Sequence, residues 1–399
     1  MTSEAETSAA ALLEQLESLT SQFSLQDEKT RAKALQLSRQ LTASLENPKT
    51  VAVELATSGF FPLAARIGVD LGLFEAIRDH DGPVSSEALA GLTGGEELLI
   101  VRLLRAMSAI GFVDEVGERL WEANAVTRVM ATEVLAAEYR MHHDLTVSKL
   151  IAVAPTFFRE NGYRCPSDPR KGWMQRAFGS DRLTFEILPT MPAIFRDFNT
   201  FMGSHHGGRE HWTDWYPVGA RLLDGAGPDG ALLVDVGGGK GHDVLAFHEK
   251  HPGRGRLVLQ DLPAVVDRVR GLDPAIEAMA YDFFTEQPIQ GARAYFYHHV
   301  LHDWSDEDCL KILRRAKGGM RPGYSRLLVN ELVVPERRAS PFHAASDLIM
   351  MAFCGGMERT EGQWRALFTA AGLEVVRIWQ PPFYEDGEAI VEAMVKEEP

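Results

Sequence analysis

A buried strand that runs into a glycine-rich turn constrains this chain more than any other feature. Residues 231–236 read Ala-Leu-Leu-Val-Asp-Val, and Gly237, Gly238, Gly239 and Gly241 follow almost without interruption. A strand, a glycine turn and a helix in this order bind nucleosides and dinucleotides, because glycine lets the backbone approach a ligand where a Cβ would collide. The sequence therefore predicts a nucleoside-binding α/β domain in the second half of the chain.

The rest of residues 221–399 repeats a strand, a turn and a helix, which is typical of a doubly wound parallel sheet. Two β-rich runs after the last helix predict a closing hairpin, as expected of a Rossmann-like class I methyltransferase sheet. The predicted strands are 231–236, 256–260, 294–298 and 326–334; the predicted helices are 243–250, 306–317 and 361–371; and the hairpin runs are 373–379 and 389–396.

Two details of the turn favour S-adenosylmethionine (SAM) over a dinucleotide. Its glycines follow the pattern GxGxG, without the third glycine of a pyrophosphate-binding turn. Asp235 also stands at the end of the strand, where a carboxylate repels a phosphate and attracts a cationic sulfonium. We therefore predict that Asp235, Gly237 and Gly239 bind the cofactor SAM.

Further acids follow at the next strand ends. Asp261, with Leu262 after it, comes 22 residues beyond Gly239, a distance at which an acid accepts hydrogen bonds from ribose hydroxyls. Asp282 and Phe283 close the following strand, and they suit an adenine amine and an adenine ring face. These residues complete the predicted nucleoside site.

A run of histidines ends the strand over residues 294–298. His298 and His302 lie in this run, and Ser305 is a suitable N-cap for the helix that follows. The run falls at the carboxyl edge of the predicted sheet, where open α/β sheets hold their ligands. His302 is therefore a candidate for chemistry beside the cofactor.

The N-terminal part, residues 1–130, predicts a long helix and then a winged helix. Leucines recur at three- and four-residue steps through residues 1–45, which indicates one helical region with an apolar packing or dimer face. Three helices and a β-ribbon then match a winged helix. The helices are predicted over 63–77, 86–90 and 96–110, and the ribbon strands over 111–116 and 119–122.

Residues 131–220 predict a helical linker that also forms the acceptor pocket. The pattern indicates a helix over 132–153, a loop over 155–171 and a second helical stretch over 173–202. Aromatic residues and methionines are dense in the second stretch. Most of them suit a core, and some suit the wall of a pocket for a flat, apolar ligand.

Winged helices often read DNA, but the charge of this chain argues against that use. Residues 63–130 hold 6 arginines and no lysine against 11 Asp and Glu, and the whole chain has a net charge of −15. Such a surface repels phosphate backbones and anionic lipid. We therefore expect no nucleic acid and no membrane as partner, and we expect the winged helix to serve dimerisation.

The location is expected to be cytoplasmic. The apolar runs are too short to span a bilayer, and Glu4 and Glu6 lie where a signal peptide needs positive charge. Cys165, Cys309 and Cys354 are far apart and form no CxxC pair, which fits a reducing compartment without structural zinc.

Residues 60–399 resemble the plant caffeic-acid-type O-methyltransferases and their fungal relatives, which place a dimerising winged helix before a SAM domain. The matching stretches are Asp235-Val236-Gly237-Gly238-Gly239, Asp261-Leu262-Pro263, Asp282-Phe283, His302-Asp303-Trp304, Asn330-Glu331 and Gly355-Gly356-Met357-Glu358-Arg359-Thr360. The resemblance implies a SAM-dependent O-methyltransferase that acts as a homodimer. Where the plant enzymes carry a lysine near the adenine, this chain has His298, so the resemblance implies that His298 is the cofactor residue at this position.

By the same resemblance, His302 is the general base, and Glu331 and Glu358 flank and orient it. A phenol has a pKa of about 10, so it needs help to lose its proton at neutral pH. A neutral histidine gives this help, worth roughly 10² to 10⁴ in rate. No metal is required, and the expected acceptor is a hydroxyl of a small aromatic or polyketide-type metabolite.

An alternative is a SAM-binding member of the same fold that no longer methylates, such as a cyclase or pericyclase. Residues 155–220 match the plant members poorly, which favours this alternative, whereas the presence of the His302 trio favours methyl transfer. The histidine pairs 142–143 and 205–206 have no assigned chemistry. The second pair, taken with His211, has no carboxylate or cysteine at ligand spacing, so we predict no metal site there.

Overall fold

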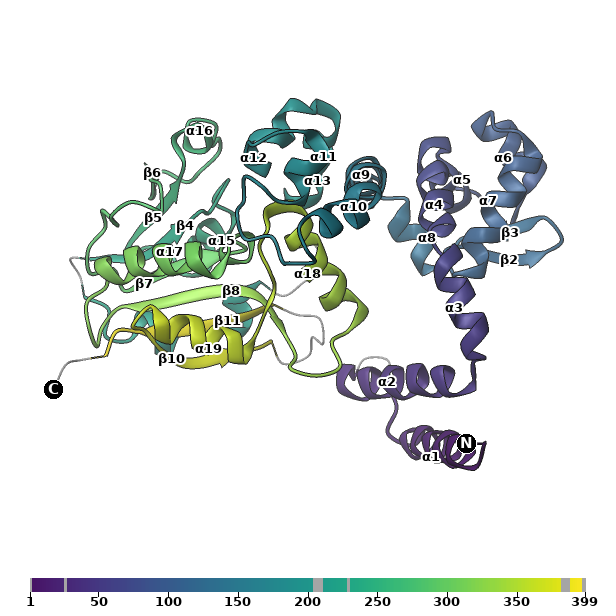
Figure 1. Cartoon of the computed structure of the whole chain (residues 1–399), viewed down its shortest axis with the longest axis horizontal. Coiled ribbons are helices and arrows are strands. Elements are labelled where there is room, and N and C mark those ends of the chain that lie inside the picture. The colour runs from purple at the N-terminus through teal and green to yellow at the C-terminus, as the bar shows by residue number, and fades with distance from the viewer. Residues whose placement is uncertain (1, 25–26, 204–210, 228–229, 382–387, 397–399) are drawn as a thin grey trace. The chain divides into compact units, whose positions relative to one another are not determined.

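The computed structural model describes residues 2–24, 27–203, 211–227, 230–381 and 388–396. The described residues of 1–152 and 185–207 form one compact unit, and those of 153–184 and 208–399 form another. Figure 1 labels the elements of both. Among the described residues, no helix combines the length and the apolar character needed to cross a membrane.

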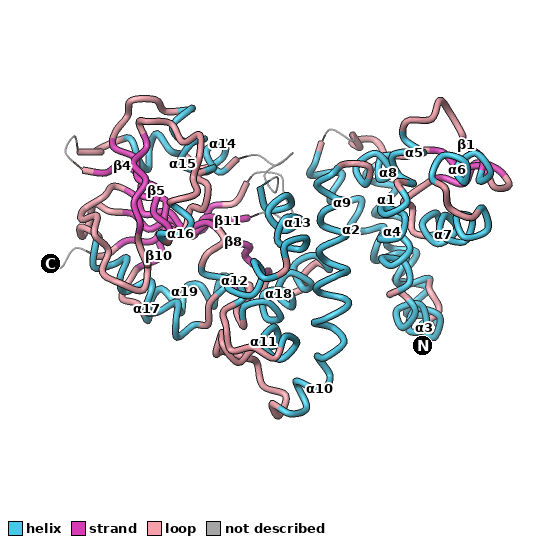
Figure 2. Tube along the Cα trace, turned by 90° about the horizontal axis from the view of Figure 1, so that it is seen from above, coloured by secondary structure: helices cyan, strands magenta, loops and turns pink. Residues whose placement is uncertain are grey.

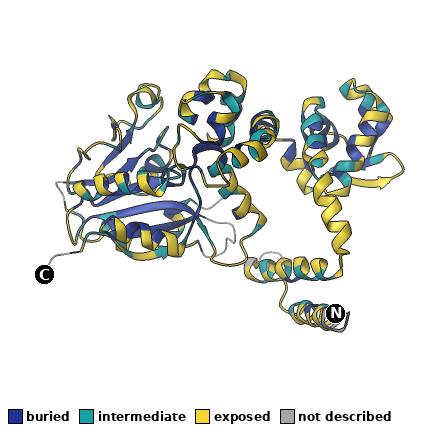
Figure 3. Ribbon diagram, in the orientation of Figure 1, coloured by how far each residue is buried: buried dark blue, intermediate teal, exposed yellow. Residues whose placement is uncertain are grey.

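Helices α1 (Thr2–Leu19), α2 (Glu28–Leu45) and α3 (Pro48–Thr57) open the first unit. The prediction of one helical region over residues 1–45 was wrong, because two separate helices, α1 and α2, occupy these residues. Asp27 caps a new helix, because its side chain accepts a hydrogen bond from the Lys29 N–H. Helices α1 and α2 pack on each other, whereas α3 buries none of its residues within the described structure (Figure 3).

The predicted winged helix is confirmed. Its elements are α4 (Phe60–Leu71), α5 (Leu73–Arg78), β1 (Val84–Ser85), α6 (Ser86–Thr93), α7 (Glu97–Ala109), β2 (Asp114–Gly117) and β3 (Leu120–Glu122). The strands pair in the order β1-β3-β2. The helix expected over 63–77 breaks at Gly72, whose φ of 65° ends α4 and lets α5 begin. Trp121 is fully buried in the core of this unit with Leu73 and Phe74.

The linker helices run further than expected. After α8 (Ala125–Met130) and α9 (Glu133–Met141), the chain continues through a π-helix, η1 (His142–Ile151), into α10 (Ala152–Glu160). The loop predicted to begin at Pro155 therefore begins only after Glu160. Pro155 lies inside this helical run, shortly after the π-helix ends, and it has no N–H to donate to the preceding turn.

The helical stretch predicted over 173–202 is interrupted. It consists of α11 (Trp173–Phe178), α12 (Thr184–Ile187), the 3₁₀ turn η2 (Leu188–Thr190) and α13 (Pro192–Gly203). Gly179 ends α11 with a φ of 57°. Helix α13 packs on α9, where Arg140 Nε donates to the buried carboxylate of Asp197 at 3.0 Å.

The second unit is built on a mixed sheet. Within the described residues, its strands follow the order β10-β11-β8-β7-β4-β5-β6, with β9 beside β8 off this path. The pairs from β8 through β6 are parallel, and only β11 and β10 run antiparallel. The strands are β4 (Ala231–Val236), β5 (Arg256–Asp261), β6 (Ile276–Ala280), β7 (Ala294–His298), β8 (Arg326–Val334), β9 (Arg359–Thr360), β10 (Glu374–Trp379) and β11 (Glu388–Met394).

Helices cover both faces of this sheet (Figure 2). Apolar side chains of α17 (Asp306–Gly319) and α19 (Glu361–Ala370) share one buried core with the strands, and those of α14 (Trp212–Trp215) and α15 (His242–Lys250) share the other. Shorter elements are η3 (Gly219–Leu223), α16 (Pro263–Val266) and η4 (Leu301–Asp303). The sequence reading missed α18 (Pro341–Cys354).

Candidate active site

The backbone of the glycine turn after β4 lies so close to neighbouring side chains that a Cβ would not fit at two of its positions. Gly237 has a φ of 74°, and a Cβ there would lie 2.9 Å from a methyl group of Val300. A Cβ on Gly238 would lie 2.5 Å from the Asp235 carboxyl group. Gly239, with a φ of 59°, would meet nothing within 4 Å, so this side of the turn is open. The turn thus presents bare backbone to a ligand.

Asp235 lies behind this turn. Its side chain is fully buried, and neither carboxyl oxygen has a hydrogen-bond partner among the described residues. Burial, together with the nearby charge of Asp243, raises the pKa of Asp235 well above its usual value. A cation bound nearby would offset this burial and favour the charged carboxylate, which fits a sulfonium cofactor.

Asp261 ties the end of β5 to the turn. Its Oδ2 accepts a hydrogen bond from the Gly239 N–H at 2.8 Å, and its Oδ1 accepts one from the Leu262 N–H at 2.7 Å. The Leu262 side chain is 49% exposed. The predicted ribose acid is therefore held rigidly beside the glycines, with an apolar residue free at its edge.

Asp282 and Phe283 follow β6. The Asp282 side chain is exposed, and its Oδ1 accepts a hydrogen bond from the Phe284 N–H at 2.9 Å. Phe283 packs against Phe284 and against Trp304, with ring centroids 5.1 and 5.9 Å away. An edge carbon of Phe283 comes within 3.9 Å of the Cβ position of Gly237, so the structure brings this predicted adenine residue to the glycine turn.

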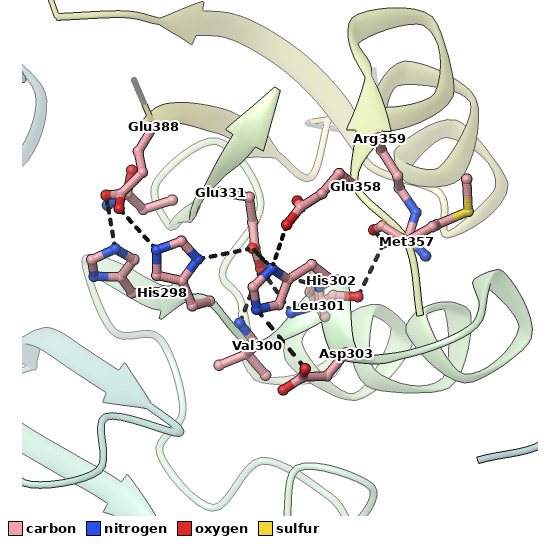
Figure 4. A network of polar contacts seen from close by, with 12 residues as sticks. His298, Val300, Leu301, His302, Asp303, Glu331, Met357, Glu358, Arg359 and Glu388 are labelled. Atoms are coloured by element: carbon pink, nitrogen blue, oxygen red, sulfur yellow. Dashed lines mark hydrogen bonds and ion pairs between the residues drawn. The ribbon is translucent and has the colours of Figure 1, made fainter. Parts of the chain in front are cut away.

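His302 lies in η4, directly after Val300 and Leu301 (Figure 4). Only 8% of it is exposed. Its Nδ1 is 3.0 Å from Glu358 Oε1 and 3.5 Å from Glu331 Oε2. Its Nε2 makes no hydrogen bond within the described residues, and it lies 3.9 Å from Asp303 Oδ1. The predicted trio of His302, Glu331 and Glu358 is therefore brought together.

Glu331 organises the backbone of this turn. Its Oε1 accepts hydrogen bonds from the N–H groups of Val300 and Leu301 at 3.0 and 2.7 Å. Burial raises the pKa of the Glu331 carboxyl, but the charges of His302 and His299 and the backbone donors outweigh it and lower the pKa to about 2. Glu331 is therefore charged at neutral pH.

The glycine pair of residues 355–356 lets the Glu358 segment approach this turn. A Cβ on Gly356 would lie 1.9 Å from the His302 carbonyl oxygen. That oxygen accepts a hydrogen bond from the Met357 N–H at 2.9 Å. The buried guanidinium of Arg359 donates to the carbonyl oxygens of Leu301 and Trp304 at 3.0 and 2.8 Å. This contact sets the position of Glu358 beside the histidine.

His298 is engaged on both sides. Its Nδ1 is 2.8 Å from Asp243 Oδ2, and its Nε2 is 2.9 Å from Glu388 Oε2. Asp243 also lies 3.1 Å from Nε2 of His211. The predicted cofactor residue His298 is thus at the expected sheet edge, but it is wedged between carboxylates.

The sequence reading missed His299, Asp243 and Glu388. His299 Nε2 lies 2.8 Å from Glu388 Oε1. The neighbouring histidines in the sequence could have identified His299 as a site residue. Glu388, in contrast, begins β11, and only the strand order of the sheet brings it to this edge. His142 and His143 lie in η1 of the other unit, and the pair 205–206 lies outside the described residues.

Comparisons with known proteins support the fold described above. Residues 228–374 match the O-methyltransferase domain family, and residues 53–133 match the O-methyltransferase dimerisation domain. The O-methyltransferase penC of Penicillium thymicola is 48% identical over 369 residues, which cover 92% of each chain. Two solved structures are 30% identical with a TM-score of 0.83: a pericyclic reaction enzyme, over 97% of this chain and 99% of its own, and LepI in complex with SAM, over 98% and 100%.

The sheet order, the closing antiparallel hairpin and the glycine turn define a class I, SAM-dependent methyltransferase fold with an N-terminal dimerisation domain. Within that class, the chain belongs to the O-methyltransferase family.

The charge of His302 makes stability depend on pH. Burial lowers the pKa of His302, but the charges of Glu331 and Glu358 outweigh it and raise the pKa to about 10. Unfolded histidine has a pKa of about 6.5. The folded state thus keeps a proton on His302 that the unfolded state loses. The resulting contribution to the free energy of unfolding is full below pH 6.5 and disappears as pH rises through about 10. Between pH 7 and 9 it falls by up to about 1.4 kcal/mol per pH unit.

We predict that His302→Gln removes this slope. Urea unfolding at pH 7, 8 and 9 measures the free energy of unfolding of both proteins. The wild type should lose stability with pH more steeply than the variant. Parallel pH dependences would mean that His302 carries no extra proton in the folded protein.

Proposed function

We propose that this protein transfers a methyl group from SAM to a phenol-like hydroxyl of a small aromatic or polyketide-type metabolite, with His302 as the general base. The observation that carries this proposal is the orientation of His302. Its Nδ1 is held by Glu358, whereas its Nε2 makes no hydrogen bond within the described residues. A ring held in this way can take a proton at Nε2.

The acceptor hydroxyl must give up its proton as its oxygen attacks. SAM, when bound, would supply an electrophilic methyl group, and its sulfonium would leave as the neutral thioether. Most of the rate gain in such a displacement comes from alignment of the reacting atoms. His302 Nε2 accepts the phenolic proton, and the charges of Glu331 and Glu358 stabilise the imidazolium that forms.

A phenol suits His302 better than other hydroxyls do. At neutral pH a phenol with a pKa of about 10 still carries its proton, so it needs a base. Only the fraction of His302 that lacks a proton serves as that base, and its raised pKa of about 10 makes this fraction grow as pH rises. A carboxylic acid needs no such base, and an aliphatic alcohol is far too weak an acid for it. The acidity of a phenol therefore favours a phenolic acceptor.

The cofactor contacts follow from the glycine turn. We assign Asp261 and Leu262 to the ribose, Asp282 and Phe283 to the adenine, and Gly237, Gly239 and the buried Asp235 to the aminoacyl end. His298 contributes positive charge at this edge. The support is the open backbone of the turn, the two hydrogen bonds that fix Asp261, and the partnerless carboxyl group of Asp235.

A second candidate function is a rearrangement or cyclisation without methyl transfer. The similarity to a solved pericyclic reaction enzyme over 97% of this chain favours it. The two candidates differ in one observable. Methyl transfer adds the mass of one methylene unit to the acceptor and turns SAM into S-adenosylhomocysteine, whereas a rearrangement does neither.

We predict that His302→Ala lowers methyl transfer to a phenol by roughly 10² to 10⁴ at neutral pH while SAM still binds. The defect should shrink above pH 10, where the phenol ionises without help. Mass spectrometry of product, followed from pH 7 to 10.5, measures this. Full activity of the variant would exclude His302 as the base. Conversion by the wild type without a gain in mass would favour the rearrangement.

We predict that Asp261→Ala weakens SAM binding by about 1.5 to 3 kcal/mol, because hydrogen bonds to a charged group are lost. Calorimetry without added metal gives the affinity. Asp273→Ala, a half-exposed acid of the same unit, serves as the matched control and should bind SAM normally. Equal affinity of all three proteins would show that the ribose lies elsewhere.

We further propose that the protein is a homodimer. Residues 53–133 match a dimerisation domain, and α3 exposes Val53 and Leu55 by 55% and 75%. Light scattering of the full-length protein at micromolar concentration should give twice the mass of one 44.2 kDa chain. Leu55→Lys should lower that mass, and a monomeric wild type would refute the proposal.

A further inference from the structure

The imidazole rings of His298, His299 and His302 form a stacked column. The centroids of His298 and His299 are 4.5 Å apart with planes at 24°, and those of His299 and His302 are 5.0 Å apart at 28°. The ring of the middle residue, His299, therefore lies directly against the ring that we assign as the base.

Carboxylates alternate with these rings. Glu388 bridges the first two, with one oxygen 2.9 Å from His298 Nε2 and the other 2.8 Å from His299 Nε2. Glu331 Oε2 lies between the last two, 3.7 Å from His299 Nδ1 and 3.5 Å from His302 Nδ1. Asp243 and Glu358 flank the ends of the column. Each of these acids comes from a different element of the fold.

The geometry favours a positive charge on the middle ring. Both nitrogens of His299 face carboxylate oxygens, Glu388 at Nε2 and Glu331 at Nδ1. A nitrogen without a proton would point its lone pair at a negative charge. His299 is therefore favoured as a doubly protonated imidazolium. The pKa of His299 is consistent with this charge. Burial and the charge of His298 lower the pKa, but the interactions with Glu388 and Glu331 outweigh them and raise it.

The backbone of His299 is unusual. Its φ is 51°, a left-handed conformation that non-glycine residues rarely adopt. Its N–H donates to the carbonyl oxygen of Asn330 at 3.2 Å. Strained positions of this kind persist where the surroundings hold them, and they cluster at functional sites. From this backbone conformation, the ring of His299 stacks between the two neighbouring rings.

His302 differs from the other two rings. Its Nδ1 faces Glu358 and Glu331, but its Nε2 has only the more distant Asp303 oxygen at 3.9 Å among the described acids. With two buried carboxylates at one nitrogen, His302 would hold a proton tightly. A base that keeps its proton at working pH cannot take one from the acceptor.

We propose that His299 is a positioning residue of the reaction, a permanently charged imidazolium that lies against His302 and keeps the proton of the base labile. The positive charge of His299 lowers the affinity of the adjacent His302 ring for a proton, as the charge of His298 lowers that of His299. Glu388 maintains the charge of His299. The effect on catalysis rests on the function proposed above, whereas the charge of His299 does not.

The first experiment tests the charge directly. Nitrogen-15 NMR of histidine-labelled protein, with His299 assigned from the His299→Gln variant, reports the protonation of both ring nitrogens. At pH 8 we expect both to carry protons in the otherwise unaltered protein. In Glu388→Gln, His299 should lose one proton by that pH. A neutral His299 ring in the wild type would overturn the proposal, whatever reaction the protein catalyses.

The second experiment tests the effect on the base. His299→Phe keeps an aromatic ring against His302 but removes the charge, and His299→Gln removes the charge with a smaller, polar side chain. In both, the acid limb of the kcat/KM profile for methyl transfer should move to higher pH by about one to two units. Activity at high pH should recover toward that of the wild type.

The matched control is His251→Phe, which changes a histidine of the same unit that packs on Phe247, outside the column. Its profile should coincide with that of the wild type. A loss of activity at every pH in the His299 variants, without a shift of the limb, would mean a structural role only and would falsify the proposal. Full activity of His302→Ala would instead refute the proposed base and leave the charge of His299 to the NMR result.

Discussion

The candidate active-site edge of this protein depends on one buried negative charge, that of Glu331. The carboxylate has no exposure to water, so its desolvation must be offset within the protein. Backbone donors at Val300 and Leu301 hold one oxygen, and His302 and His299 face the other. Because a single group fixes both the turn and the ring on it, the backbone position and the protonation of His302 are set together.

The sequence predicted the part of this arrangement that local patterns encode. The buried run of residues 231–236 and the glycines after it required a strand and a tight turn, and the structure has both. His302, Glu331 and Glu358 were predicted as a trio through family resemblance, and they meet within 3.5 Å. Spacing alone would not have joined them, because they lie on η4, on β8 and on the segment before β9.

The features that were not predicted from the sequence depend on tertiary structure or on hydrogen bonding. Glu388 approaches His298 and His299 because β11 inserts antiparallel beside β8, which sets Ala389 opposite Glu331. No periodicity within a single segment carries that information. The π-helix η1 was also missed, since its residues show the same apolar spacing as an α-helix and differ only in hydrogen bonding.

The column explains how this chain can replace a lysine without losing positive charge. The plant enzymes that it resembles have a lysine where His298 stands, and a neutral imidazole there would remove a cation from the predicted cofactor edge. Asp243 and Glu388 instead face both nitrogens of His298, and although burial opposes it, their charges raise its pKa well above the usual value. The replacement therefore preserves the positive charge. A lysine is a mobile point charge, whereas the His298 ring is fixed on two sides. A fixed ring can stack, and stacking on His299 extends its influence toward His302.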